Sequence, residues 1–150
     1  MFSAARPVKV LLVEDNETDV LMAREALKDS PVEIELHVID NGVDAIRFLS
    51  AAEEAGTAIA LPDLVLLDWN LPQKSGREVL HEIKTDDRLK RIPVVVLTTS
   101  EAEDDIGTAY DLHANSFVTK PLDFAQFRAA LRATERFWFH VASLPPRAYG

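Results

Sequence analysis

Four short apolar runs in this chain each end abruptly in polar residues, and this repeated pattern restricts the fold more than any other feature. The runs are residues 10–13, 64–67, 94–97 and 117–118. The polar residues that follow them are Glu14-Asp15, Asp68, Thr98-Thr99 and Thr119-Lys120. Uncharged runs of this length suit strands that are covered on both faces of a parallel sheet. The carboxyl ends of such strands lie at one edge, where open α/β sheets bind ligands.

Helical patterns separate these runs. Asn16 caps a predicted helix that extends to about Lys28, and Asn41-Gly42 opens a second helix after an alternating, half-exposed edge strand at residues 33–39. Further helices are expected after Gly76, from Ser100 with Glu103 as a capping box, and from Asp123 to Leu144. The alternation predicts an α/β fold, a doubly wound parallel sheet of five strands with helices on both faces.

The requirement that the candidate site residues lie close together favours one strand order over the others. Glu14-Asp15 can meet Asp68 only if the first and third strands are neighbours. The order 2-1-3-4-5 achieves this and places the reversal of winding between those two strands. Thr98 and Lys120 then follow outward on the fourth and fifth strands.

Length and composition narrow the functional class. With 150 residues we expect a single domain at residues 8–144, a flexible N-terminus at 1–7 and a flexible tail at 145–150. The formal net charge of −9 disfavours nucleic-acid and membrane partners. Cysteine is absent, which excludes disulfides and thiolate chemistry. No apolar signal segment precedes Lys9, so a cytoplasmic protein is expected. Only six residues follow Leu144, so no output domain is expected after the receiver.

The polar residues at the strand ends suit metal-assisted phosphoryl transfer. Singly, each has an ordinary explanation: a turn-forming Asp, a helix cap, a solvated lysine or a strand threonine. Together they offer carboxylates that a hard cation such as Mg²⁺ can bridge. Asp68 can attack phosphorus to form an acyl phosphate, Lys120 can hold the phosphoryl oxygens by charge, and Thr98 can donate a hydrogen bond to them.

The set of residues resembles the receiver domain of two-component response regulators, over about residues 8–133. The resemblance rests on Glu14-Asp15, on Asp68 with Asn70-Leu71-Pro72 and Gly76, on Thr98, and on Lys120-Pro121. It implies a flavodoxin-like fold and a phosphorelay function with a histidine kinase as partner. It also implies Asp68 as phosphoacceptor, Thr98 and Lys120 as phosphoryl-binding residues, and a Mg²⁺ site formed by Glu14, Asp15, Asp68 and the Asn70 carbonyl.

Two finer expectations follow from the resemblance. Phe117 occupies the position of the family's switch aromatic, which turns inward as the threonine moves, although an ordinary core aromatic explains it equally well. The chain is also similar to the small regulators that accompany phytochrome-type kinases. This similarity rests on Asp68-Trp69-Asn70-Leu71-Pro72, on the charged run at residues 86–91, and on the aromatic tail around Phe137-Trp138-Phe139.

Two other functions compete with the signalling hypothesis. A Mg²⁺-dependent phosphohydrolase also uses an aspartyl phosphate, but its nucleophile follows the first strand and has a second Asp two residues later, where this chain has Asn70. An inactive receiver that serves only for docking is disfavoured by the complete set of acids, Thr98 and Lys120. The expectation is therefore a signalling protein that phosphorylates and slowly dephosphorylates itself, not an enzyme.

Two structural expectations concern the C-terminal region. The resemblance favours a cis peptide bond between Lys120 and Pro121, with a trans bond as the alternative. A helix from Asp123 to Leu144 would be about 33 Å long and would overhang the sheet by about two turns. Its bare aromatics, Phe137, Trp138 and Phe139, predict a two-fold homodimer, with the strand 117–119 and the helix after Ser100 contributing. The alternative is a tail that folds back on its own domain.

Overall fold

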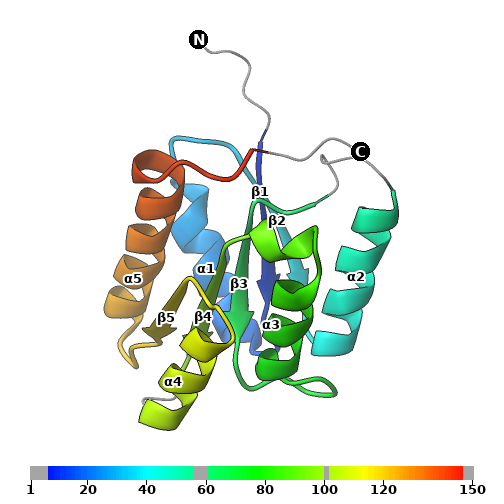
Figure 1. Cartoon of the computed structure of the whole chain (residues 1–150). Helices are drawn as coiled ribbons and strands as arrows, with labels where there is room; N and C mark the ends of the chain where they lie inside the picture. The colour runs from blue at the N-terminus through cyan, green and yellow to red at the C-terminus, as the bar shows by residue number, and fades with distance from the viewer. Residues whose placement is uncertain (1–6, 56–60, 100–101, 147–150) are drawn as a thin grey trace.

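The computed structural model describes residues 7–55, 61–99 and 102–146, in which strands and helices alternate along the chain (Figure 1). The elements are β1 (Val8–Val13), α1 (Glu17–Lys28), β2 (Ile34–Ile39), α2 (Gly42–Glu54), β3 (Leu64–Asp68), α3 (Gly76–Thr85), the short 3₁₀ turn η2 (Leu89–Arg91), β4 (Val94–Thr98), α4 (Glu103–Asp111), β5 (Ser116–Thr119), α5 (Phe124–Arg136) and the π-helical turn η3 (Phe137–Val141). The expectations for residues 1–6 and 147–150 lie outside the described residues.

The five strands form one parallel sheet in the order β2-β1-β3-β4-β5, as the sequence predicted. β3 and β4 are buried at every position, which explains their unbroken apolar sequences. β2 is an edge strand of alternating burial, and its register pairs Val13 of β1 with Ile39. In this strand order β1 and β3 are neighbours, as the candidate site requires.

Two hydrophobic clusters lie on opposite faces of the sheet. One contains Leu49 of α2, Ile83 of α3 and Ala109 of α4, packed on alternate residues of the strands. The other contains Ala23 of α1 with Phe127 and Leu131 of α5. Figure 1 shows the same arrangement, with α1 and α5 side by side on one face. Helices therefore cover the sheet on both faces.

Three of the N-cap residues predicted from the sequence cap their helices in the structure, and one helix begins at a different residue. Asn16, Asn41 and Asp123 each accept a backbone N–H from the first turn of their helices. The predicted cap Ser100 lies outside the described residues. α4 begins at Glu103 with Ala102 in the N-cap position, so this helix lacks a side-chain cap among its described residues. A complete capping box occurs instead at Ser75 and Glu78 of α3.

The C-terminal helix is shorter than predicted. Regular α-helix ends at Arg136, and the π-helical turn η3 continues only to Val141, three residues before Leu144. Trp138 and Phe139 are half-buried against the cluster of α1 and α5. The expectation of a long overhang was wrong, because the wider turn brings two of its aromatics back onto their own domain.

Candidate functional site

Polar residues from four strands meet at the carboxyl edge of the sheet. Glu14 and Asp15 follow β1, Asp68 is the last residue of β3, Thr98 is the last residue of β4, and Lys120 follows β5 directly. The Lys120 N–H donates to the Thr98 carbonyl at 2.7 Å, which fixes the start of the β5–α5 loop beside β4. Glu14, Asp68, Thr98 and Lys120 are all buried, while Asp15 is exposed.

The three acidic side chains form a potential cation site. One carboxylate oxygen from each of Glu14, Asp15 and Asp68 lies within 4.8 Å of the other two. Carboxylates held this close repel each other, and a hard divalent cation with oxygen ligands relieves that repulsion. The donor set consists only of oxygen and is open to solvent at Asp15, which fits an ion that keeps some of its water.

Lys120 lies at the centre of the charged cluster. Its Nζ contacts the Glu14 carboxylate, donates to Asp19 Oδ2 at 2.8 Å, and lies 3.7 Å from Asp68 Oδ2. Asp19 is a site residue that the sequence analysis did not recognise, because an acidic residue in the first turn of a helix is ordinarily explained by its favourable interaction with the helix dipole. Its partner Lys120 lies 101 residues further along the chain, so no local sequence signal identifies the contact.

Burial and charge shift two pKa values in this cluster. Desolvation raises the pKa of Glu14 to about 7; the hydrogen bond from Lys120 opposes this shift, and the neighbouring Asp68 adds to it. Burial also acts to lower the pKa of Lys120, but hydrogen bonds to Asp19 and Glu14 and the charge of Asp68 raise it above its usual value. Lys120 is therefore a permanent cation beside Asp68 at neutral pH.

The loop after β3 connects Asp68 to β4. The Asn70 N–H donates to Asp68 Oδ1 at 3.4 Å, and the Asn70 side-chain amide donates to Thr98 Oγ1, also at 3.4 Å. Both hydrogen bonds are long, so they orient these groups only weakly. The structure thus brings all the predicted strand-end residues together, with Asn70 exposed at the rim.

The expected cis peptide bond between Lys120 and Pro121 is absent, since all peptide bonds among the described residues are trans. This prediction was wrong. Trans is the favoured isomer of an X–Pro bond, and the Lys120 side chain reaches Glu14, Asp19 and Asp68 from the trans backbone.

The remaining predicted residues lie away from the acids. Phe117 of β5 is half-buried and meets Trp69 edge-on, with ring centroids 6.5 Å apart. Phe137 and Trp138 contact each other in η3, where Phe137 is exposed.

Among the described residues, none of the helices is both long and apolar enough to span a membrane.

Comparison with known proteins decides the family. The response regulator receiver domain family matches residues 10–132. The chain belongs to this family. Response regulator Rcp1 of Synechocystis sp. is 44% identical over 139 residues, which are 93% of this chain and 94% of Rcp1.

Two solved structures extend the similarity to the fold. The phosphorylated cyanobacterial phytochrome response regulator RcpA has 46% identity and a TM-score of 0.88, covering 94% of this chain and all of RcpA. The Mn²⁺-bound form of Rcp1 has 43% identity and a TM-score of 0.87, covering 93% of this chain and all of Rcp1. The receiver fold and the response-regulator function predicted from the sequence are confirmed, and the phosphohydrolase alternative is not favoured.

Proposed function

We propose that this receiver accepts a phosphoryl group on Asp68 from a histidine kinase and signals by binding a partner differently in its two states. The observation that carries the proposal is the position of Asp68. Its carboxylate shares a cation site with Glu14 and Asp15 and lies 3.7 Å from the Lys120 ammonium group. A nucleophile between two sources of positive charge suits the transfer of an anionic group.

The residues divide the chemistry among them. An Asp68 carboxylate oxygen forms the new bond to phosphorus, and the kinase imidazole departs as the bond from its nitrogen to phosphorus breaks. Lys120 holds a phosphoryl oxygen by charge, and Thr98 donates its hydroxyl to another. Glu14, Asp15, Asp68 and the Asn70 carbonyl would hold Mg²⁺, which neutralises negative charge on the transferring group. The same residues assist the slow self-dephosphorylation that we expect, without turnover of an external substrate.

We propose a phytochrome-type light sensor as the kinase. Support comes from the similarity to RcpA and Rcp1 over nearly the whole chain. A kinase that takes its phosphoryl group from ATP also implies a cytoplasmic location.

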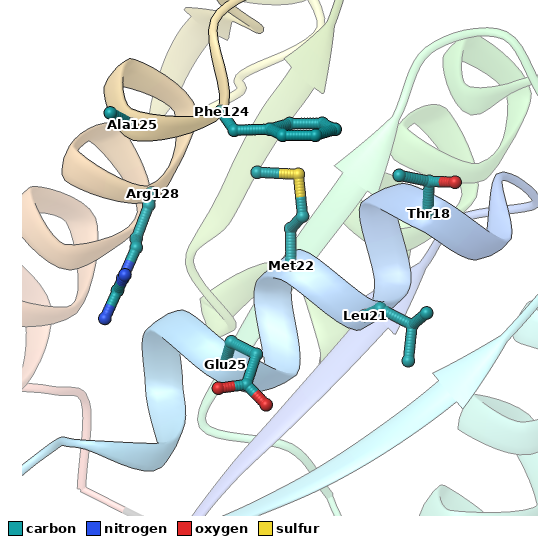
Figure 2. A pocket seen from close by; sticks show the side chains of 7 residues that line it. All are labelled: Thr18, Leu21, Met22, Glu25, Phe124, Ala125 and Arg128. Atoms are coloured by element: carbon teal, nitrogen blue, oxygen red, sulfur yellow. The ribbon is translucent and has the colours of Figure 1, made fainter.

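The surface between α1 and α5 suits the docking of the kinase. A groove of about 470 Å³ lies between α1 and α5, and Figure 2 shows Met22 and Phe124 facing each other across it. Leu21 is 63% exposed and Phe124 66% exposed. Glu25 and Arg128 also line it and can fix the orientation of a charged partner. An exposed apolar groove of this kind, between two helices, is where a partner helix would bind.

We also propose a homodimer through the C-terminal segment, with α4 and β5 contributing. Phe137 and Val141 are both largely exposed in η3, and two-fold pairing would cover them. Because Trp138 and Phe139 are half-buried on their own domain, the dimer patch is smaller than the sequence predicted. Phe137 is therefore the principal aromatic of the proposed interface.

Phosphorylation by acetyl phosphate tests the proposed function. With Mg²⁺ the protein should gain the mass of one phosphoryl group, and the gain should disappear with EDTA. Turnover of a generic phosphomonoester should be absent. Steady hydrolysis of the phosphomonoester would favour a phosphohydrolase, and the absence of any phosphorylation would favour a docking module. Transfer from a phytochrome-type kinase should be faster than from an unrelated histidine kinase.

A further inference from the structure

Asp19 of α1 accepts a hydrogen bond from the ammonium group of Lys120. The Lys120 Nζ donates to Asp19 Oδ2 at 2.8 Å and also to the Glu14 carboxylate. A lysine ammonium has three N–H donors, and these two acceptors account for two of them. Asp68 Oδ2 lies 3.7 Å from Nζ, beyond the length of an ordinary hydrogen bond. The ammonium is therefore bonded beside the nucleophile and not to it.

The turn between β1 and α1 holds both acceptors of the ammonium in place. Asn16 is the N-cap of α1, and its Oδ1 accepts the Asp19 N–H at 3.0 Å. The Asn16 N–H donates to Glu14 Oε2 at 3.2 Å. A carboxylate in the first turn of a helix is also stabilised by the helix dipole. One hydrogen-bonded turn thus fixes Glu14 and Asp19 on either side of Asn16.

Asp19 has two opposite effects on a phosphoryl group at Asp68. Its negative charge repels the anionic group, but Asp19 is partly exposed, and a single charge of this kind changes a rate by about fivefold or less. Its hydrogen bond also fixes Lys120, which without it would be drawn towards the Asp68 carboxylate. A displacement of about 1 Å in a reacting site can cost about 100-fold in rate. The positional effect is therefore the larger one.

We propose that Asp19 is a positioning residue for phosphoryl transfer, and that its hydrogen bond holds the Lys120 ammonium at the distance that suits an oxygen of a phosphoryl group on Asp68. The bond keeps Lys120 off the unmodified carboxylate, whose oxygen stays available to attack phosphorus. The third N–H of Lys120 then donates to a phosphoryl oxygen while the bond to Asp19 is kept. This inference rests on the proposed function, because it assigns a further residue to the same site.

The rate of phosphorylation by acetyl phosphate tests the position of Lys120. In this reaction an Asp68 carboxylate oxygen bonds to phosphorus, and acetate departs with the electrons of the broken bond. Asp19→Ala removes the acceptor and should slow the reaction about tenfold, which lies between the two magnitudes above. Asp19→Asn keeps an acceptor oxygen and removes the repelling charge, so it should react at or above the wild-type rate. Mass spectrometry of samples quenched over time gives the rate constants.

Glu17→Ala is the matched control. Glu17 lies in the same turn of α1 but is exposed, so this variant loses the same charge and should keep the wild-type rate within about twofold. Alanine is a good helix former, so α1 should persist in both alanine variants, which urea unfolding checks. In a Lys120→Met background, Asp19→Ala should cause no further slowing, because Asp19 acts through Lys120.

Beryllofluoride gives a second readout that involves no reaction. With Mg²⁺ it occupies the place of a phosphoryl group, and ¹⁹F NMR measures its affinity. Asp19→Ala should weaken binding about tenfold, and Asp19→Asn should restore the wild-type affinity.

Each result decides for or against the inference. Phosphorylation of Asp19→Ala at or above the wild-type rate would overturn the positioning role, since repulsion would then be the larger effect. Asp19→Asn as slow as Asp19→Ala, or slowing by Asp19→Ala that persists in Lys120→Met, would overturn it as well. These results would leave the proposed function intact, provided that the wild type phosphorylates. A wild type that neither phosphorylates nor binds beryllofluoride would overturn the proposed function itself.

Discussion

The strand-end site and the C-terminal turn both hold side chains for which the sequence predicted a function, but different forces place them. At the site, four parallel strands bring Glu14, Asp68, Thr98 and Lys120 to one edge, so the backbone alone determines their proximity. At η3, the positions of Trp138 and Phe139 depend on which surface their rings find. The strand order determines where the strand-end residues lie. The positions of the η3 aromatics depend on side-chain packing, which the periodicity of the sequence does not reveal.

Removal of Lys120 should give the largest effect and tests whether the site depends on charge balance. Lys120→Met leaves Glu14 and Asp68 buried without their cation, and breaking a buried pair in this way costs about 3–5 kcal/mol. Urea unfolding without metal should show a loss of about that size, and Mg²⁺ should restore more stability to the variant than to the wild type.

The matched control for this variant is Lys74→Met. Lys74, in the loop before α3, pairs with Glu82 of that helix, and because both side chains keep contact with solvent such a pair contributes about 1 kcal/mol. Equal losses in the two variants would contradict the view that burial of opposing charges is specific to the strand-end site.

Serine substitutions in η3 test which aromatic side chains stabilise the fold by packing on their own domain and which are available for the proposed dimer interface. Trp138→Ser and Phe139→Ser should each lower the free energy of unfolding by about 1–2 kcal/mol, because half-buried aromatics lose part of their transfer energy. At protein concentrations too low for the proposed dimer to form, Phe137→Ser should change it by less than about 0.5 kcal/mol, since the side chain is 49% exposed.

Sedimentation velocity on the same proteins tests the dimer. The wild type should be dimeric at tens of micromolar, and Phe137→Ser should be a folded monomer that still phosphorylates. A wild type that sediments as a monomer in both phosphorylation states would eliminate the dimer and leave η3 as a purely structural element.

The sequence predicted the positions of the strand-end residues far better than the structure of the C-terminal segment. The reason is that the first depends on local signals and the second on contacts between distant residues. Asn16, Asn41 and Asp123 cap helices through local hydrogen bonds, and apolar runs identify buried strands without knowledge of neighbours. The partnership of Asp19 with Lys120 joins residues 101 positions apart, and only the folded chain reveals it. The packing of Trp138 and Phe139 in the π-helical turn likewise depends on tertiary contacts.

The pH dependence of stability should separate the two regions further, with a smaller effect. Folded Glu14 has a pKa of about 7, against 4.5 for the ordinary group, so between these values the native state holds a proton that the unfolded state has lost. Stability in EDTA should therefore fall as pH rises from 4.5 to 7, by an amount on the order of 1 kcal/mol.

Glu14→Gln is the control for this titration. Its stability, relative to the wild type, should improve across the same interval, because the variant lacks the titrating carboxyl. The raised pKa of Lys120 contributes stability that is lost only above its ordinary value of 10.5, so it does not interfere. A wild type that gains stability relative to Glu14→Gln between pH 5 and 8 would show that the Glu14 proton is not retained on folding.

The smallest expected signal is optical. Trp69 lies beside Asp68, so its fluorescence should change when Mg²⁺ enters the acidic cluster. Trp138 is a second emitter in the tail, and the titration therefore uses a Trp138→Phe background. An identical change in a Trp69→Phe variant that retains Trp138 would mean that the tail, and not the site, senses the ion.

Mapping the phosphorylated residue tests the central claim most directly. After treatment with acetyl phosphate and Mg²⁺, borohydride reduction converts an aspartyl phosphate to homoserine, which peptide mass spectrometry locates. We expect homoserine at position 68 in the wild type and no phosphorylation in Asp68→Asn. Homoserine at position 15, or undiminished phosphorylation of Asp68→Asn, would contradict the assignment of Asp68 as the phosphoacceptor.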